Sequence, residues 1–328
     1  MVTYFPQPNT NMPIGCDFCG IVEDGNEDII ASFPRGTRVC GGTFPYAHAE
    51  DPANLVSGAF AEYVAADANQ LLRVPDAWDD LQSASVGLIC WGTCIGALFA
   101  DPEALSLAGR PSEPADKGVP VVVYGGATAT GTMACQLLKL SGHYPIAVTS
   151  TASAPLARKY GAVGTAAYTS PTCAETVRSL SPGGRPIRHV MDCITTAESV
   201  SISFAAIGRA GGRYACLESL DPSWLTRKAI HTREVMGFEA MGRDVSFMGG
   251  ENTTYSRDAN LQLYARGVKW TAELQVAVDT GKILPHPVRE VGGGGSWEER
   301  IIRGLGILRR GEVKRERLVV RVAGSADW

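Results

Sequence analysis

The sequence VVVYGGATATGTMACQLLKLSG, which runs from residue 121 to residue 142, joins an apolar strand to a helix through a turn of small residues. Its first three valines are a β-branched run of the kind that forms a buried parallel strand. Gly125 and Gly126 then turn the chain, and apolar residues recur at helical spacing after Thr128. The first amides of this helix should therefore point over the strand end. Free amide donors and the positive end of a helix dipole suit a pyrophosphate.

Gly126, Thr128 and Gly131 occupy the glycine positions of a G-x-G-x-x-G dinucleotide-binding turn, with threonine in the middle. The middle glycine usually lets the backbone approach the phosphates, and a threonine hydroxyl can donate to the same group. A glycine-rich turn without any nucleotide is the alternative interpretation of this pattern.

The next apolar run, residues 145–149 (PIAVT), should lie parallel to the first strand and end beside an adenosine ribose. An NAD site usually places Asp or Glu there, but no carboxylate occurs between Gly126 and Glu175. The segment carries hydroxyl and basic side chains instead: Ser150, Thr151, Ser153, Arg158 and Lys159. Such donors fit a 2′-phosphate, which favours NADPH over NADH. The alternative is that the two basic residues are ordinary solvated helix charges.

The 328 residues suffice for two domains, and their composition is that of a soluble enzyme. Thirty basic and 34 acidic residues give a net charge of −4, which provides no field for nucleic acid or an anionic membrane. The nine cysteines form no regular framework and no signal peptide is visible, so we expect reduced thiols and a cytoplasmic protein.

An uncharged run at residues 81–100 approaches the length of a membrane span. It contains polar residues and three glycines, and aspartates rather than basic residues flank it. We therefore expect a buried helix between two domains.

Strand and helix patterns alternate from Val119 to about Leu217, which predicts a parallel sheet with right-handed crossovers. The segments before Pro75 resemble short antiparallel strands at residues 20–23, 37–40 and 60–65. After Asn252 the patterns predict helices at 261–280 and 297–310 and strands at 286–291 and 318–322, which should return to the first domain.

The sequence resembles the medium-chain dehydrogenase/reductases, and within them the trans-acting enoyl reductases of fungal polyketide synthases, such as the lovastatin-type enzymes. The resemblance rests on six segments: GCDFCGIV (15–22), GAFAEYVAADANQLLRVP (58–75), YGGATATGT (124–132), MDCIT (191–195), FAAIGRAGG (204–212) and the C-terminal LVVRV. It implies an α/β protein with a Rossmann-type NADPH-binding domain at residues 91–252. It further implies a β-rich GroES-like catalytic domain at 1–90 and 253–328, partial because it is shortened at its N-terminus.

The same resemblance implies NADPH-dependent reduction of an α,β-unsaturated acyl thioester held on the carrier domain of a polyketide synthase. It also implies a cofactor site. The pyrophosphate is expected at Gly126, Thr128, Ala129 and Thr130, the 2′-phosphate at Ser150 and Arg158, and the adenine side at Tyr168. Cys193, Ile194, Thr195 and Leu217 are expected at the ribose and nicotinamide.

The zinc-dependent relatives carry G-H-E where this chain has Gly15, Cys16 and Asp17, and no second lobe of closely spaced cysteines is visible. Cys16 and Cys19 lack a matching second pair, so two packed thiols are the better interpretation. The polar loop with His48, Glu50 and Asp51 has no companion. We expect a zinc-independent reductase without a metal.

No catalytic proton donor is assigned. Tyr4, Tyr46, His231 and His286 lie in no motif that identifies one, and each is interpreted as structural. Only fourteen residues precede Gly15, so the N-P-x-D-x-K-like segment of the family, with its lysine near the cofactor, has no counterpart in this sequence.

Two other functions remain open. The chain could be an NADPH-dependent reductase of a free quinone or enone, or a non-catalytic NADPH-binding protein that docks on a synthase. In each case we expect a monomer.

Overall fold

The computed structural model describes residues 14–44, 58–245 and 256–322. The chain divides into two compact units. The first comprises residues 1–89, 241–260 and 285–328, and the second comprises residues 90–240 and 261–284. The predicted helix at 261–280 therefore groups with the second unit, which differs from the sequence-based expectation that everything after residue 252 returns to the first.

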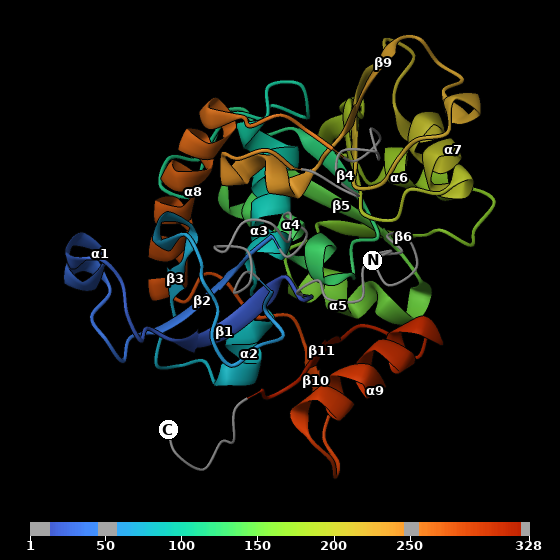
Figure 1. The fold of residues 1–328 in the computed structure, drawn as a ribbon. Coiled ribbons are helices and arrows are strands. Elements are labelled where there is room, and N and C mark those ends of the chain that lie inside the picture. The colour runs from blue at the N-terminus through green and yellow to red at the C-terminus, as the bar shows by residue number, and fades with distance from the viewer. Residues whose placement is uncertain (1–13, 45–57, 246–255, 323–328) are drawn as a thin grey trace. The chain divides into compact units, whose positions relative to one another are not determined.

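The second unit is built on a six-stranded parallel sheet with the strand order β6-β5-β4-β7-β8-β9 (Figure 1). Its strands are β4 (Pro120–Tyr124), β5 (Tyr144–Thr149), β6 (Gly164–Ala167), β7 (His189–Asp192), β8 (Gly212–Cys216) and β9 (Ile230–Glu234). The chain first moves outward from β4 to β6 and then crosses to β7 on the other side of β4. This is the order of a dinucleotide-binding sheet, with its switch point between β4 and β7. The predicted Rossmann-type fold is confirmed.

Helices cover both faces of this sheet. α4 and α5 pack together over β4 and β5, and α6 and α7 pack together on the opposite face. The helices of this unit are α3 (Leu88–Ile95), α4 (Ala129–Leu140), α5 (Ala154–Lys159), α6 (Cys173–Ser179), α7 (Ala197–Ala206) and α8 (Leu261–Asp279). Leu88 and Ile89, which open α3, fall in the first unit.

Burial on both faces explains the valine run of β4. Val122 and Tyr124 belong to a core cluster with Phe204 of α7. Val121 and Val123 point to the other face and are also fully buried. A strand covered on both sides has no position for a polar side chain, so its sequence is continuously apolar rather than alternating.

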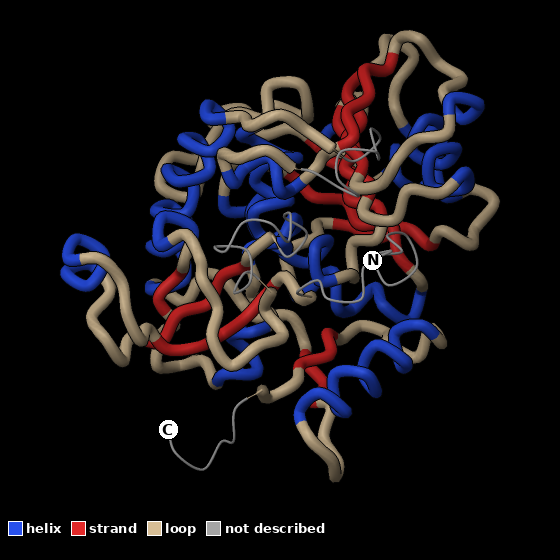
Figure 2. Tube along the Cα trace, viewed as in Figure 1, coloured by secondary structure: helices blue, strands red, loops and turns tan. Residues whose placement is uncertain are grey.

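The first unit contains a three-stranded antiparallel sheet of β1 (Asp17–Ile21), β2 (Arg38–Gly42) and β3 (Leu72–Arg73). Its helices are α1 (Glu27–Ser32), α2 (Asp80–Ala84) and α9 (Trp297–Arg309). A separate parallel pair is formed by β10 (Val288–Glu290) and β11 (Arg317–Val319), and Figure 2 shows these two short strands beside α9. Ser296 caps α9 in a capping box with Glu299.

The strand predicted at residues 60–65 does not form. Among the described residues, the backbone hydrogen bonds near this segment are donated by Ala59 to Gly15 and by Phe60 to Ile14. Glu62 and Tyr63 are both exposed, so the alternation of residue types does not correspond to an alternation of burial. The prediction was wrong because a period-two pattern without a buried face specifies no strand.

The uncharged run at 81–100 is buried, but it is not one helix. α2 ends at Ala84, α3 begins at Leu88, and a π-helical turn covers Gly96–Ala100. Gly87 lies in the break, where an added Cβ would lie 2.1 Å from the Asp17 carboxyl carbon. The close approach of this backbone to Asp17 explains the interruption, which a hydropathy pattern cannot reveal.

None of the helices within the described ranges combines the length and the apolar character that crossing a bilayer requires.

Candidate cofactor site at the carboxyl end of the parallel sheet

Three glycines shape the turn between β4 and α4, each for a different reason. Gly125 has a φ of +76°, a left-handed conformation that disfavours residues with a Cβ. An added Cβ on Gly126 would lie 2.5 Å from the Cβ of Ala147 on β5. On Gly131 it would lie 2.2 Å from the carbonyl oxygen of Gly125. The turn therefore requires glycine at all three positions, and α4 packs directly against the backbone that precedes it.

Thr128 is the N-cap residue of α4. Its hydroxyl oxygen accepts a hydrogen bond from the amide of Gly131 at 3.0 Å. The amides of Ala129 and Thr130, also in the first turn, have no hydrogen-bond acceptor among the described residues. These two donors, together with the helix dipole, form the kind of site that an anion occupies.

Ser150, Arg158 and Tyr168 follow the neighbouring strands. Ser150 comes directly after β5, and its hydroxyl donates to Ser153 at 2.8 Å. Arg158 lies on the exposed side of α5, and its guanidinium donates to Thr165 of β6 at 3.0 Å. Tyr168 follows β6 and is 36% exposed. The structure therefore places all three at the carboxyl-end loops of β5 and β6 or on the helix between them.

Cys193, Ile194 and Thr195 form the loop after β7. The amide of Cys193 donates to the carbonyl of Tyr124, the last residue of β4, at 3.0 Å. Thr195 has a φ of +57°, and its hydroxyl accepts from the amide of Leu217, which follows β8, at 3.3 Å. The loop after β7 is thus hydrogen-bonded both to the end of β4 and to the segment after β8.

The thiol of Cys193 is not a candidate nucleophile. Burial raises its pKa well above the ordinary value, and the charge of Asp192 adds to the effect. Cys90 and Cys94 of α3 also face α4, where their thiols donate to the carbonyls of Ala129 and Thr130. Burial likewise raises the pKa of Cys94 far above the ordinary value. Cys94 and Cys193 are therefore protonated thiols and not thiolate nucleophiles.

The histidines and tyrosines that the sequence singled out provide no catalytic constellation within the described residues. His231 bonds through Nε2 to the carbonyl oxygen of Glu103 at 2.9 Å. His286 is buried, and burial together with the charge of Arg317 lowers its pKa to about 4. Tyr4 and Tyr46 lie outside the described residues, as do His48, Glu50 and Asp51.

The contacts of Cys16, Asp17 and Cys19 are those of residues that stabilise the fold. All nine cysteines are free thiols, and Cys19 lies opposite Cys40 in the β1–β2 register. Asp17 accepts from the amide of Ile89 at 2.9 Å and forms an ion pair with Arg317. Across residues 14–44, 58–245 and 256–322, no group of three or more His, Cys, Asp or Glu side chains is placed to hold a metal ion.

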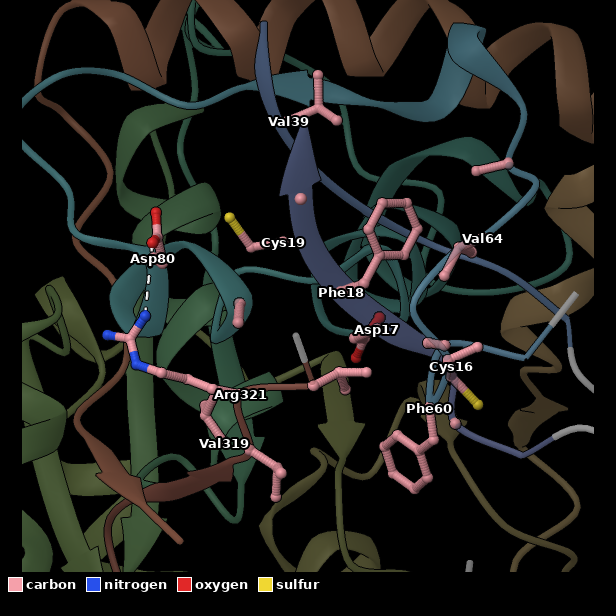
Figure 3. A pocket seen from close by; sticks show the side chains of 18 of the residues that line it. Cys16, Asp17, Phe18, Cys19, Val39, Phe60, Val64, Asp80, Val319 and Arg321 are labelled. Carbon is pink, nitrogen blue, oxygen red and sulfur yellow. Dashed lines mark ion pairs between the residues drawn. The ribbon is translucent and has the colours of Figure 1, made fainter. Parts of the chain in front are cut away.

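A large apolar groove, of about 1790 Å³, lies entirely within the first unit (Figure 3). It is bordered by β1, α9 and β11, and Phe18, Phe60 and Val319 are among its lining residues. On one side of the groove, Arg321 Nη1 and Asp80 Oδ2 form an ion pair at 3.6 Å. None of the predicted cofactor-binding residues lines it, so this groove is distinct from the site described above.

Comparisons with known proteins agree with this architecture. Residues 1–76 match the alcohol dehydrogenase GroES-like domain. Over 326 residues the chain is 49% identical to the trans-enoyl reductase sthE of Phaeosphaeria nodorum, a match that covers 99% of this chain and 85% of that protein.

Two solved structures have the same fold. An alcohol dehydrogenase superfamily protein from Novosphingobium aromaticivorans superposes with a TM-score of 0.69 at 21% identity, over 96% of this chain and 84% of that one. Mycobacterial Rv1454c, solved in complex with NADPH, superposes with a TM-score of 0.61 at 22% identity, over 92% of this chain and 81% of that one.

A parallel dinucleotide-type sheet combined with a GroES-like domain defines the medium-chain dehydrogenase/reductase fold. Within that class, the chain belongs to the family of the fungal trans-enoyl reductases. The resemblance identified from the sequence motifs is confirmed.

The sequence did not assign a role to Asp192, although it lies in the MDCIT motif. Its carboxylate is fully buried and accepts from the amides of Ile194 and Thr195 and from the hydroxyl of Tyr214. The sequence did contain a signal for this role: a carboxylate at the end of a buried strand must be surrounded by hydrogen-bond donors.

Proposed function

We propose that this protein binds NADPH at the carboxyl end of its parallel sheet and reduces the α,β-unsaturated acyl thioester on a polyketide synthase carrier domain. Binding of NADPH is supported by one observation in particular: the amides of Ala129 and Thr130 at the start of α4 have no hydrogen-bond acceptor among the described residues. The family membership carries the enoyl-reductase part.

The residues of this chain suit the diphosphate. Gly126 is the turn residue before the helix, and its lack of a side chain lets the backbone lie close to β5. The amides of Ala129 and Thr130 donate to the phosphate oxygens. The hydroxyl oxygen of Thr128 accepts from the amide of Gly131, and the same hydroxyl makes a side-chain hydrogen bond with the Cys193 thiol of the loop after β7.

The segment after β5 distinguishes NADPH from NADH in this proposal. Ser150 and Arg158 provide a hydroxyl and a guanidinium for a 2′-phosphate. No carboxylate occurs between Gly126 and Glu175 to repel that phosphate. Tyr168 supplies an aromatic surface for the adenine side, and its 36% exposure leaves that surface accessible.

NADPH supplies the hydride, which the β-carbon of the enoyl group receives, while the α-carbon takes up a proton. The loop of Cys193, Ile194 and Thr195, with Leu217, borders the ribose and nicotinamide in this proposal. Ile194 is 41% exposed. An apolar side chain at this place helps to exclude water from the reacting carbon.

The proposed partner is the carrier domain of a polyketide synthase, which presents the substrate as a tethered thioester. We further propose that the chain works as a monomer in the cytoplasm, without a metal ion. The first unit is the proposed GroES-like catalytic domain and the second the proposed NADPH-binding domain.

The test is oxidation of NADPH, followed by its absorbance, with a short crotonyl-type thioester as substrate. Turnover of the thioester, without turnover of a free quinone or a simple enone, is the expected result. Preferred turnover of the quinone would establish the alternative reductase. Binding of NADPH without oxidation on any enoyl substrate would establish a non-catalytic docking protein.

A further inference from the structure

The carboxylate of Asp192 lies at the end of β7 and is 0% exposed. Oδ1 accepts from the amides of Ile194 at 2.8 Å and Thr195 at 3.0 Å, and Oδ2 accepts from the hydroxyl of Tyr214 at 2.7 Å. No ion pair of the described residues includes it. A buried charge without a cation is costly, so these three donors are what makes it tolerable.

Two of the three donors belong to the loop that follows. Thr195 adopts a φ of +57°, which is unusual for a β-branched residue and requires support from its surroundings. Asp192 accepts from the successive amides of Ile194 and Thr195, and the hydroxyl of Thr195 in turn accepts from the amide of Leu217. The shape of the loop after β7 and its bond to the segment after β8 thus depend on one carboxylate.

The same loop rests on the glycine turn. A Cβ added to Gly125 would lie 3.0 Å from Cγ1 of Ile194 and 3.3 Å from Cβ of Cys193. The loop after β7 is therefore in contact with the turn that precedes α4.

Tyr214 fixes the carboxylate from the other side. The ring is 1% exposed and stands edge-to-face against Phe204, with 5.4 Å between the ring centroids. Burial and the charge of Asp192 raise the pKa of Tyr214, so its hydroxyl remains protonated and donates. The ring has no freedom to move away, which makes it a rigid anchor for Oδ2.

We infer that Asp192, anchored by Tyr214, is a positioning residue that sets the geometry of the Cys193–Thr195 loop and of Leu217 for binding the nicotinamide half of the cofactor. This inference rests on the proposed function. Asp192 touches neither cofactor nor substrate in this role, since both of its oxygens are occupied by protein donors.

The test compares Asp192→Ala with Asp192→Asn, Tyr214→Phe and a control lesion, Val177→Ala. Val177 is fully buried on α6 in the core cluster that also holds Tyr214, and it takes part in none of the hydrogen bonds that support the loop. Two measurements are made on each purified protein: the dissociation constant for NADPH by fluorescence titration, and hydrogen exchange of residues 193–196 without cofactor.

We expect Asp192→Ala to raise the dissociation constant at least tenfold and to accelerate exchange of the Ile194 and Thr195 amides. Asp192→Asn should stay within about threefold of the unmodified protein. The amide oxygen of asparagine can accept from the same two N–H groups, and its NH₂ can donate to a turned Tyr214 hydroxyl. Tyr214→Phe should fall between these two variants.

The control separates positioning from general loss of stability. Val177→Ala should lower the melting temperature while leaving both the dissociation constant and loop exchange unchanged. The inference is overturned if Asp192→Ala binds NADPH within twofold of the unmodified protein, or if Val177→Ala weakens binding equally at the same loss of melting temperature.

Hydrogen exchange distinguishes failure of this inference from failure of the proposed function. If the unmodified protein binds no NADPH, the proposed function and the cofactor part of this inference both fail. Protection of the Ile194 and Thr195 amides that is lost in Asp192→Ala then still supports the loop-holding role. Rapid exchange of these amides in the unmodified protein overturns that role.

Discussion

The hydroxyl oxygen of Thr128 accepts the amide hydrogen of Gly131 at 3.0 Å, so the threonine that replaces the middle glycine of the phosphate turn is also the cap of α4. The substitution thus adds a helix cap to the turn. It also places a hydroxyl beside the Cys193 thiol of the loop after β7, next to the proposed phosphate site.

Replacing Thr128 tests both contributions. Thr128→Ala removes the cap and should lower the free energy of unfolding by about 1 kcal/mol, and it should weaken NADPH binding as well. Thr128→Ser keeps the hydroxyl and should preserve both properties. Urea unfolding and cofactor titration measure them, and a fully stable Thr128→Ala protein would contradict the capping role.

Gly131 should tolerate no side chain. Its Cβ would lie 2.2 Å from the carbonyl oxygen of Gly125 and 2.8 Å from the Cα of Gly126, both backbone atoms that cannot rotate away. Gly131→Ala should destabilise the fold by roughly 2–3 kcal/mol. The control is Gly292→Ala, where no atom lies within 4 Å of the added Cβ. Thermal unfolding of the two variants should differ clearly, and equal melting temperatures would refute the packing argument.

Arg158 should discriminate between the two nicotinamide cofactors. Arg158→Ala should weaken binding of NADPH by roughly 1.5–3 kcal/mol, the size of one charge-assisted hydrogen bond to phosphate, and barely affect NADH. Lys159→Ala is the matched control, because the Lys159 ammonium lies over the Tyr160 ring at 5.7 Å. Titration with each cofactor provides the measurement. Equal weakening of NADPH and NADH binding by Arg158→Ala would remove Arg158 from the 2′-phosphate site.

His286 should make stability depend on pH. Burial, followed by the charge of Arg317, lowers its pKa from 6.5 to about 4, so the unfolded chain binds a proton between these values that the folded protein does not. Its stabilising effect is therefore complete above pH 6.5 and is lost as the pH falls toward 4. Between pH 7.5 and pH 5 the loss should be about 2 kcal/mol.

The comparison for this prediction is His286→Gln, which has no titrating side chain at this position. Its free energy of unfolding in urea should fall less than that of the unmodified protein between pH 7.5 and pH 5. His189, whose pKa burial also lowers to about 4, is present in both proteins and cancels from the difference. Identical pH dependence of the two proteins would mean that His286 is protonated in the fold.

The strands of the second unit were predictable to different degrees for physical reasons. β4 and β5 are buried on both faces, so their sequences are short, mainly apolar runs that admit few other structures. β9, with the sequence IHTRE, is an edge strand with polar side chains, and it carried no comparable signal. The pattern at 60–65 had a strand-like period, but the described residues contain no strand that pairs with it.

The residues of the candidate site were also predictable to different degrees. The positions of Gly125, Gly126 and Gly131 were recognisable because backbone geometry and close approach leave no other residue type. The cofactor residues that the family resemblance implied lie in the segments that follow the parallel strands, with Arg158 on α5 and bonded to Thr165 of β6, and their cofactor roles stay predictions. Asp192 was missed because a carboxylate in isolation gives no indication of which amides will surround it.

The sequence by itself determined the fold class, the strand-to-helix turn and the family, because these depend on local periodicity, on glycine positions and on motifs that lie within short segments. Only the tertiary structure decided that Asp17 interrupts the apolar run at Gly87, that α8 belongs with the parallel sheet, and that Asp192 joins Tyr214 to the loop after β7. Each of these depends on contacts between residues far apart in the chain, or on a backbone shape that the contact itself imposes. Local sequence patterns predict neither the long-range contacts nor the backbone shape that such contacts impose.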